Sequence, residues 1–190
     1  MEFLAQSDRL VLRRPSAQDE AAFLSLLRAS AEFHAPWVPT PPKGSDPHGP
    51  EVFKAYLASD TGERCLRTLI FRRDDEGAPS LTLVGAINLN EIVRGVFHSA
   101  YLGYWLGAPF TGHGYMTGAL RLLIAHAFKS QVEGGLGLHR LEANIMPHNT
   151  ASLAVARKLG FRQEGLSKRY LKIAGAWQDH ERWTILADEH

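Results

Sequence analysis

The chain has 190 residues, 45% of them hydrophobic, which is enough for one domain with a sizeable core. Its 21 lysines and arginines nearly balance 20 aspartates and glutamates, so no overall field would recruit nucleic acid or an anionic membrane. A single cysteine excludes an internal disulfide framework and is typical of a reducing compartment. No apolar run reaches about 18 residues, and the N-terminus lacks the pattern of a signal peptide. We therefore expect one soluble, cytoplasmic domain over 1–190.

The N-terminal part combines a strand, a helix and an unusual loop. Apolar residues alternate over 9–14, which predicts a first strand. Ser16 and Asp19 have the spacing of a helix N-cap and predict a helix that continues to Ala31. Residues 32–50 contain six of the ten prolines and predict a long extended loop, because proline disrupts regular helix.

Regular patterns return after this loop and continue to the C-terminus. The expected elements are a helix over 51–60, strands over 67–72 and 81–89 joined by the polar turn 74–77, a loop over 90–99, a strand over 101–106, a helix over 114–129, a strand over 141–146, a helix over 151–159, and two strands over 162–173 and 177–186. This order predicts an α/β layered domain in which one mixed sheet carries helices on its faces.

The glycine turn before the helix over 114–129 is the first candidate site. Gly112 and Gly114 would leave backbone N–H groups free at a helix N-terminus, where the helix dipole also favours an anion such as a pyrophosphate. A plain tight turn is the simpler alternative. The spacing to Gly118 also imitates a dinucleotide fingerprint, but the turn follows a hairpin and lies past the middle of the chain, which disfavours a Rossmann site.

The second half of the chain resembles the GNAT superfamily of N-acetyltransferases, and specifically its RimJ/RimL-like branch. Two motifs carry the resemblance: Gly112-x-Gly114-Tyr115-Met116-Thr117, and Asn149-x-x-Ser152 followed by Lys158-Leu159-Gly160-Phe161 and Glu164-Gly165. It covers about 9–186. It implies a single-domain GNAT fold, with a mixed, mostly antiparallel central sheet, helices on both faces, and a splay between the strands over 101–106 and 141–146 where acetyl-CoA lies.

The resemblance also implies the residues that bind acetyl-CoA. Backbone groups near Trp105 and Leu106 would pair with the pantetheine arm and polarise the thioester carbonyl. Asn149 would hold the same arm as well as cap a helix. The diphosphate would meet the backbone amides of the loop: Gly112, His113, Gly114, Tyr115 and Met116, with the hydroxyl of Thr117. Arg157 or Lys158 would contact the 3′-phosphate, although a solvated basic face also explains such residues.

Ser152 is the candidate proton donor to the departing thiolate. The branch places a serine near the sulfur, and Ala156 stands where many relatives carry a tyrosine for this step. A positioned donor contributes about 10²- to 10⁴-fold in rate. The alternative role for Ser152 is that of a first-turn helix residue bonded to the backbone.

The general base is less well determined. Tyr101 stands where an acid often activates the amine in this superfamily. Glu142 is the nearest acid on the neighbouring strand, but it could instead form a salt bridge with Arg140 or Arg121. At about pH 7.4 roughly a quarter of an α-amine is neutral, against about 0.1% of a lysine side chain. An enzyme without a strong base therefore acetylates an α-amine more easily, which agrees with the branch's protein N-terminal acetylation.

The acceptor pocket would combine the proline-rich loop with the terminal hairpin. Its expected residues are Phe33, His34, Trp37, Tyr101 and Trp177, although the aromatic rings could equally belong to the core. We therefore expect an acetyl-CoA-dependent N-acetyltransferase that acts on a primary amine, most readily a protein N-terminus such as that of a ribosomal protein. A small-molecule amine acetyltransferase and a catalytically weak CoA-binding regulator are the alternatives. No metal, nucleic acid or membrane partner is expected, and a homodimer remains open.

Overall fold

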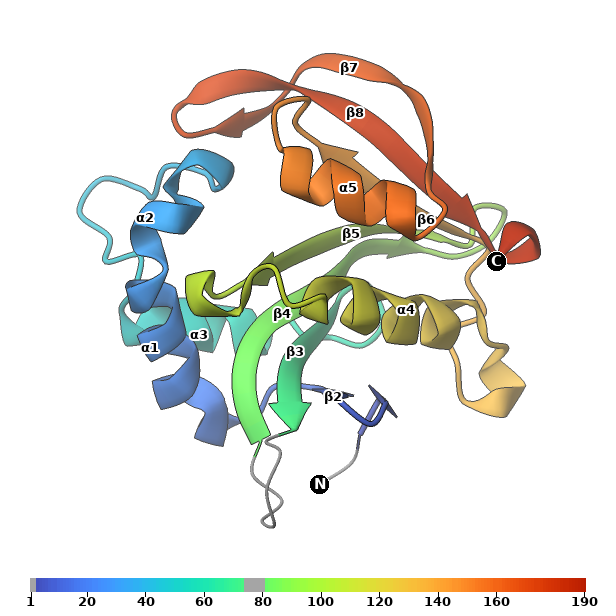
Figure 1. The fold of residues 1–190 in the computed structure, drawn as a ribbon, viewed down its shortest axis with the longest axis horizontal. Coiled ribbons are helices and arrows are strands. Elements are labelled where there is room, and N and C mark those ends of the chain that lie inside the picture. The colour runs from blue at the N-terminus through green and yellow to red at the C-terminus, as the bar shows by residue number, and fades with distance from the viewer. Residues whose placement is uncertain (1–2, 74–80) are drawn as a thin grey trace.

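The structure, a computed structural model, describes residues 3–73 and 81–190. Within them one sheet has the strand order β1-β2-β3-β4-β5-β6-β8-β7 (Figure 1). Its strands are β1 (Ala5–Gln6), β2 (Leu10–Arg13), β3 (Leu66–Arg73), β4 (Leu81–Val93), β5 (Ser99–Leu106), β6 (Arg140–Ile145), β7 (Arg162–Ile173) and β8 (Ala176–Leu186). β5 and β6 are parallel, and all other neighbours are antiparallel. The predicted mixed, mostly antiparallel sheet is confirmed.

Helices cover both faces of this sheet. They are α1 (Glu20–Ala29), α2 (Ala31–His34), α3 (Pro50–Ala58), α4 (Tyr115–Phe128) and α5 (Thr150–Lys158). α4 and α5 pack on one face, where Leu120 and Leu153 join the main core. α1 and α3 pack on the other face, where Phe23 and Phe53 join a second core. We call these the α4/α5 face and the α1/α3 face. No helix of the described residues is long and apolar enough to cross a bilayer.

The strand periodicity explains why each strand serves both cores. On β3, Ile70 lies in the main core, whereas its neighbours Leu69 and Phe71 lie in the second core. Successive side chains on a strand point to opposite faces, so a strand with apolar residues on both sides is buried between two layers of helices.

Three expected elements differ in the structure. The helix predicted to reach Ala31 ends at Ala29, because Ser30 leaves helical geometry and its Oγ accepts a hydrogen bond from the Ala108 N–H at 2.9 Å. The predicted loop over 32–50 begins with α2 and the 3₁₀-helix η2 (Ala35–Trp37), since a proline near a helix start costs no hydrogen bond. β4 continues to Val93, into the predicted loop. The predicted turn over 74–77 lies outside the described residues.

The central feature of the sheet is the incomplete pairing of β5 with β6. Their ladder ends at the pair Leu102 and Ala143, although β5 continues to Leu106 and β6 to Ile145. Beyond that pair each strand keeps its other neighbour, β4 or β8. We call this opening, formed by 103–106 and 144–145, the splay. The splay expected from the family resemblance is therefore present.

A charged cluster joins β6, β7 and β8 beside the paired end of this ladder. Arg140 lies 2.5 Å from Glu164 and 2.8 Å from Glu142, and Arg162 lies 3.2 Å from Glu164. The hydrogen bond from Arg140 lowers the pKa of Glu164 from 4.5 to about 2, against the opposing effect of its partial burial. A carboxylate with a depressed pKa stabilises the fold above its unfolded pKa and loses that contribution as the pH falls towards its folded pKa.

We therefore expect Glu164 to contribute to acid sensitivity in the window below about pH 4.5. The variant Glu164→Gln should be less stable than the wild type near neutral pH, and should lose less stability between about pH 5 and pH 3. Urea unfolding midpoints across this range measure both effects. Equal slopes for the two proteins would show that Glu164 does not carry the dependence.

Candidate functional site

The turn that precedes α4 is shaped by two glycines in the left-handed region. Gly112 and Gly114 both have a φ of +78°, and an added Cβ would meet nothing within 4 Å at either position. The requirement for glycine is therefore conformational. Gly114 is the N-cap of α4 and provides no side-chain cap. The first N–H groups of α4 are available to an external acceptor, and the helix dipole adds positive potential there.

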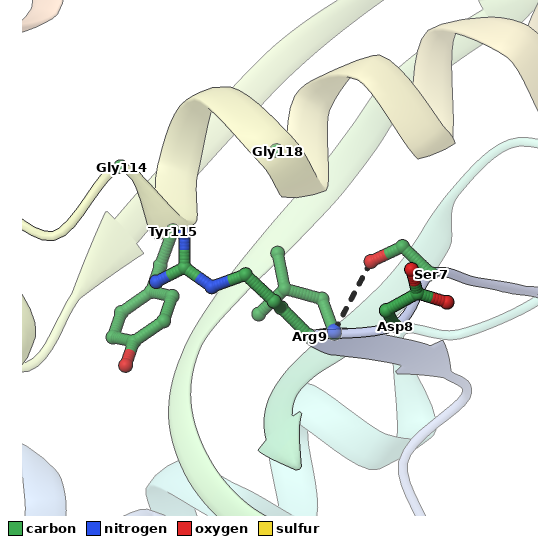
Figure 2. Close-up of a pocket in the computed structure, with 7 residues that line it drawn as sticks. Ser7, Asp8, Arg9, Gly114, Tyr115 and Gly118 are labelled. Atoms are coloured by element: carbon green, nitrogen blue, oxygen red, sulfur yellow. Dashed lines mark hydrogen bonds between the residues drawn. The ribbon is translucent and has the colours of Figure 1, made fainter.

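Aromatic and basic side chains surround this turn. The His113 ring stacks on Tyr115 with centroids 5.6 Å apart, and its Nδ1 lies 2.7 Å from the Thr111 carbonyl oxygen. Arg9 extends over the Tyr115 ring, 5.3 Å from its centroid, beside a pocket of about 240 Å³ that Ser7 also lines (Figure 2). Arg9 thus adds a cation that the sequence did not indicate, because it lies 104 positions from His113, whose carbonyl oxygen it faces at 3.4 Å.

On the α4/α5 face, the splay brings two hydroxyl groups together. Tyr104 of β5 joins the main core, as the alternation from Ala100 and Leu102 requires. Burial raises the pKa of Tyr104, and a hydrogen bond with the Ser152 side chain partly offsets this effect. Ser152 lies in the first turn of α5, where its N–H donates to Asn149 Oδ1 at 3.1 Å. The predicted capping role of Asn149 is therefore present, and Tyr104 is a polar neighbour that no local sequence pattern indicated.

On the α1/α3 face, the open end of β5 is fixed by aromatic contacts. The Trp105 ring lies 5.4 Å from both Phe23 of α1 and His34 of α2. His34 Nε2 lies 2.8 Å from the Leu106 carbonyl oxygen. The structure thus places His34, Trp105 and Leu106 together at the splay.

The predicted acid Glu142 lies in the paired part of the β5–β6 ladder, one residue pair before the ladder ends. It pairs with Tyr101 within the β5–β6 ladder, and its carboxylate is 2.8 Å from Arg140, one of the two salt-bridge partners left open by the sequence. Partial burial and the Glu142 charge raise the pKa of Tyr101. Asn144, two residues farther along β6, is the polar side chain that reaches the open part on this face.

The proline-rich loop connects to the other walls of the splay. The Trp37 ring lies 5.4 Å from His148, in the turn between β6 and α5. The Val38 carbonyl oxygen accepts a hydrogen bond from the Ala174 N–H at 3.0 Å, at the tip of the β7–β8 hairpin. Phe33 and Trp177 are 47% and 61% exposed, so neither belongs to the core. The proline-rich loop and the β7–β8 hairpin are therefore joined into one continuous border on this side of the domain.

The two predicted phosphate contacts on α5 lie at its far end. Arg157 and Lys158 occupy the last turn, about 12 Å along the helix axis from Asn149. The Arg157 guanidinium lies 5.3 Å from the centroid of the Trp183 ring. The described residues contain no cluster of three or more His, Cys, Asp or Glu side chains that could hold a metal ion.

Residues 9–162 match the family model of the acetyltransferase (GNAT) domain. The chain is 42% identical to the ribosomal protein uS5-alanine N-acetyltransferase of Escherichia coli over 98 residues, or 52% of this chain and 48% of that protein. It spans about half the length of the curated relatives it matches.

Two solved structures resemble the whole domain. RimJ of Mycobacterium smegmatis, in complex with CoA-disulfide, is 33% identical with a TM-score of 0.81, covering 95% of this chain and 83% of that one. The ribosomal-protein-S5-alanine acetyltransferase of Vibrio fischeri is 26% identical with a TM-score of 0.82, covering 97% and 96%.

Proposed function

Because the chain belongs to the GNAT acetyltransferase family, we propose that it is an acetyl-CoA-dependent N-acetyltransferase that transfers an acetyl group directly to a protein or peptide α-amine. The observation that carries this proposal is the splay between β5 and β6, at the end of β5 that leads through the short 3₁₀-helix Ala108–Phe110 to the N-terminus of α4. The Tyr104 and Ser152 hydroxyls border it on the α4/α5 face, and the rings of Trp105 and His34 border it on the α1/α3 face. Two substrates can therefore approach from opposite faces.

The residues present fit a CoA derivative. The free N–H groups at 112–117 suit a diphosphate, since unpaired donors at a helix N-terminus bind anions. The open edge of β5 near Trp105 and Leu106 suits the amide groups of a pantetheine arm, and Asn149 lies at the adjacent start of α5. When bound, acetyl-CoA supplies an activated acetyl group.

Ser152 is the proposed proton donor to the sulfur that leaves the acetyl group. Its hydroxyl lies beside the hydroxyl of the partly buried Tyr104, so the two form a short chain that can deliver and replace one proton. Backbone N–H groups of the open β5 edge would face the carbonyl oxygen on which negative charge develops.

The choice of acceptor rests on the salt bridge that Glu142, the predicted general base, forms with Arg140. Because of this salt bridge, the Glu142 carboxylate is already engaged and does not stand free beside the acceptor amine. A substrate that is already partly neutral has the advantage, and this favours an α-amine over a lysine side chain. The E. coli relative is named for acetylating an alanine of ribosomal protein uS5. We therefore place a protein N-terminus, such as that of a ribosomal protein, in the acceptor site.

CoA release with acetyl-CoA and a peptide panel tests this proposal. Each peptide with a free α-amine is paired with the same peptide blocked at its N-terminus but carrying a free lysine, and small amines form a third group. Turnover confined to free α-amines is expected. Preference for lysine or for small amines would overturn the acceptor proposal, and binding of acetyl-CoA without turnover on any amine would overturn the enzymatic one.

A left-handed residue at the start of α4 offers a test of the anion site. Gly114→Ala should weaken CoA binding about tenfold, because a Cβ disfavours the φ of +78° and distorts the N–H groups. Gly160→Ala is the matched control. Gly160 has a similar φ of +83°, and an added Cβ would meet nothing within 4 Å, but this glycine follows the C-terminal end of α5 and does not belong to the turn before α4. Calorimetric titration with CoA should separate the two variants, whereas thermal melting should show similar losses. Equal CoA affinity in both would exclude a role for this turn.

A further inference from the structure

Asn144 occupies a special position in the sheet. It is the first residue of β6 beyond the last β5–β6 pair, Leu102 and Ala143. On β6, Leu141, Ala143 and Ile145 join the core under α4 and α5. The alternation of the strand therefore turns Asn144 to the α1/α3 face, which is also the face of Trp105.

The side-chain oxygen of Asn144 is buried without a partner. Its Oδ1 atom has no hydrogen bond among the described residues. Buried polar atoms are almost always bonded, and an unsatisfied one costs stability. The β5 residue that follows the last pair is Gly103, which offers no side-chain donor to this oxygen; the place of its absent Cβ is bordered by Asn90, whose Nδ2 would be 3.2 Å away. The atom is therefore an acceptor that the described residues leave available for a hydrogen bond from a bound group.

The chemistry of this oxygen selects a donor. A carboxamide oxygen only accepts hydrogen bonds, and it does not take a proton near neutral pH. An amine that approaches the splay from the α1/α3 face carries N–H donors and no obligatory negative charge. An N–H of the amine would donate a hydrogen bond to Asn144 Oδ1 and be oriented by it, while the lone pair of the amine nitrogen stays free for attack.

We propose that Asn144 binds the α-amine of the acceptor through Oδ1 and aims its nitrogen into the splay. This inference rests on the proposed function, because it assigns the amine-binding residue of that reaction. Asn144 holds the amine and does not deprotonate it, so the proton is lost to solvent before attack. The enzyme then works on the neutral fraction of its substrate.

Peptide binding provides a readout apart from turnover. A peptide with a free α-amine and its desamino analogue are titrated calorimetrically into the protein saturated with CoA. The wild type should bind the amine at least tenfold more tightly than the analogue. Asn144→Leu, which keeps the branched shape of the side chain but removes the oxygen, should bind the two peptides within about twofold of each other and should keep its CoA affinity. Asn144→Asp, which restores an oxygen, should recover the preference.

Thr68→Val is the matched control. Thr68 Oγ1 is also buried without a partner among the described residues, but it lies on β3, two strands away from β5. This variant should keep the full preference for the amine. Steady-state kinetics should show a peptide KM at least tenfold higher in Asn144→Leu, with the KM for acetyl-CoA unchanged.

The outcomes are separable from those of the proposed function. If the wild type acetylates peptides but Asn144→Leu keeps the tenfold preference, or if Asn144→Asp fails to restore it, the role of Asn144 is overturned alone. If the wild type neither binds nor acetylates any peptide, both proposals fall. A wild type that acetylates peptides but does not distinguish the desamino analogue also overturns the role of Asn144.

Discussion

Replacing Ser152 by alanine should lower kcat at least about a hundredfold and leave CoA affinity unchanged. The hydroxyl lies in the first turn of α5, in contact with the hydroxyl of the partly buried Tyr104 at the edge of the splay. A positioned proton donor contributes about 10²- to 10⁴-fold to a rate. Alanine is a strong helix former, and Asn149 still caps the Ser152 position through the backbone N–H, so α5 should remain intact. CoA release and calorimetric CoA titration measure the two effects.

Tyr104→Phe is the control that shows whether Ser152 or Tyr104 donates the proton to the departing thiolate. It keeps the ring in the core and removes only the second hydroxyl, so a loss of less than about tenfold is expected if Ser152 is the direct donor. A loss as large as that of Ser152→Ala would instead make Tyr104 the donor. If Ser152→Ala kept more than about one tenth of the wild-type kcat, Ser152 would be only a helix residue.

Removing the buried carboxylate of Asp19 should destabilise the fold by about 3–5 kcal/mol. Asp19 and Arg13 are each 6% exposed and form two bonds, at 2.5 and 2.7 Å. Asp19 also accepts the Ser16 N–H at 2.7 Å, as the sequence spacing predicted. In Asp19→Ala the Arg13 guanidinium would remain buried without its counter-charge, over the Phe71 ring. Urea unfolding measures the loss.

The control for this prediction is an exposed ion pair. Glu51 and Lys54 lie 2.7 Å apart on the surface of α3, where solvent screens their attraction. Glu51→Ala should leave the urea midpoint nearly unchanged. A comparable loss in both variants would mean that the burial of the Arg13–Asp19 pair has no energetic consequence.

The acid response of Asp19 has a defined sign. Burial raises the pKa of Asp19, but the hydrogen bonds from Arg13 and Ser16 together lower it by more. The folded pKa is therefore below 3.8. Its contribution is complete above the ordinary pKa and disappears as the pH falls through the folded one. The unfolding midpoint of Asp19→Asn should therefore depend less on pH than that of the wild type in this acid window.

The local sequence patterns predicted most elements correctly. Apolar periodicity located α4, and the Asn149 cap with its downstream residues located α5. The patterns failed where long-range contacts decide the geometry. α1 ends early because Ser30 binds the backbone of Ala108, a contact across 78 positions that no local signal encodes. The splay itself was expected only from the family resemblance, since strand patterns do not show where a ladder stops.

The same limit applies to the candidate site. The glycine turn was predictable because its function depends on backbone conformation, which glycine spacing indicates. Tyr104 and Asn144 were missed although alternation along their strands gives their faces, because their importance depends on the residue at which β5 and β6 separate. Arg9 was missed because only the folded chain brings it to Tyr115.

The separation of β5 from β6 creates two strand edges inside the molecule. At the outer rim of a sheet, unpaired backbone groups invite pairing with other chains, and β7 at that rim carries Lys168, Arg169 and Lys172, the type of charge that discourages it. The inner edges need no such protection, because α4 and α5 cover one side of them and the proline-rich loop lies close to the other. Groups that would promote aggregation at the rim are therefore kept inside the domain, where the proposed function uses them to bind a pantetheine arm.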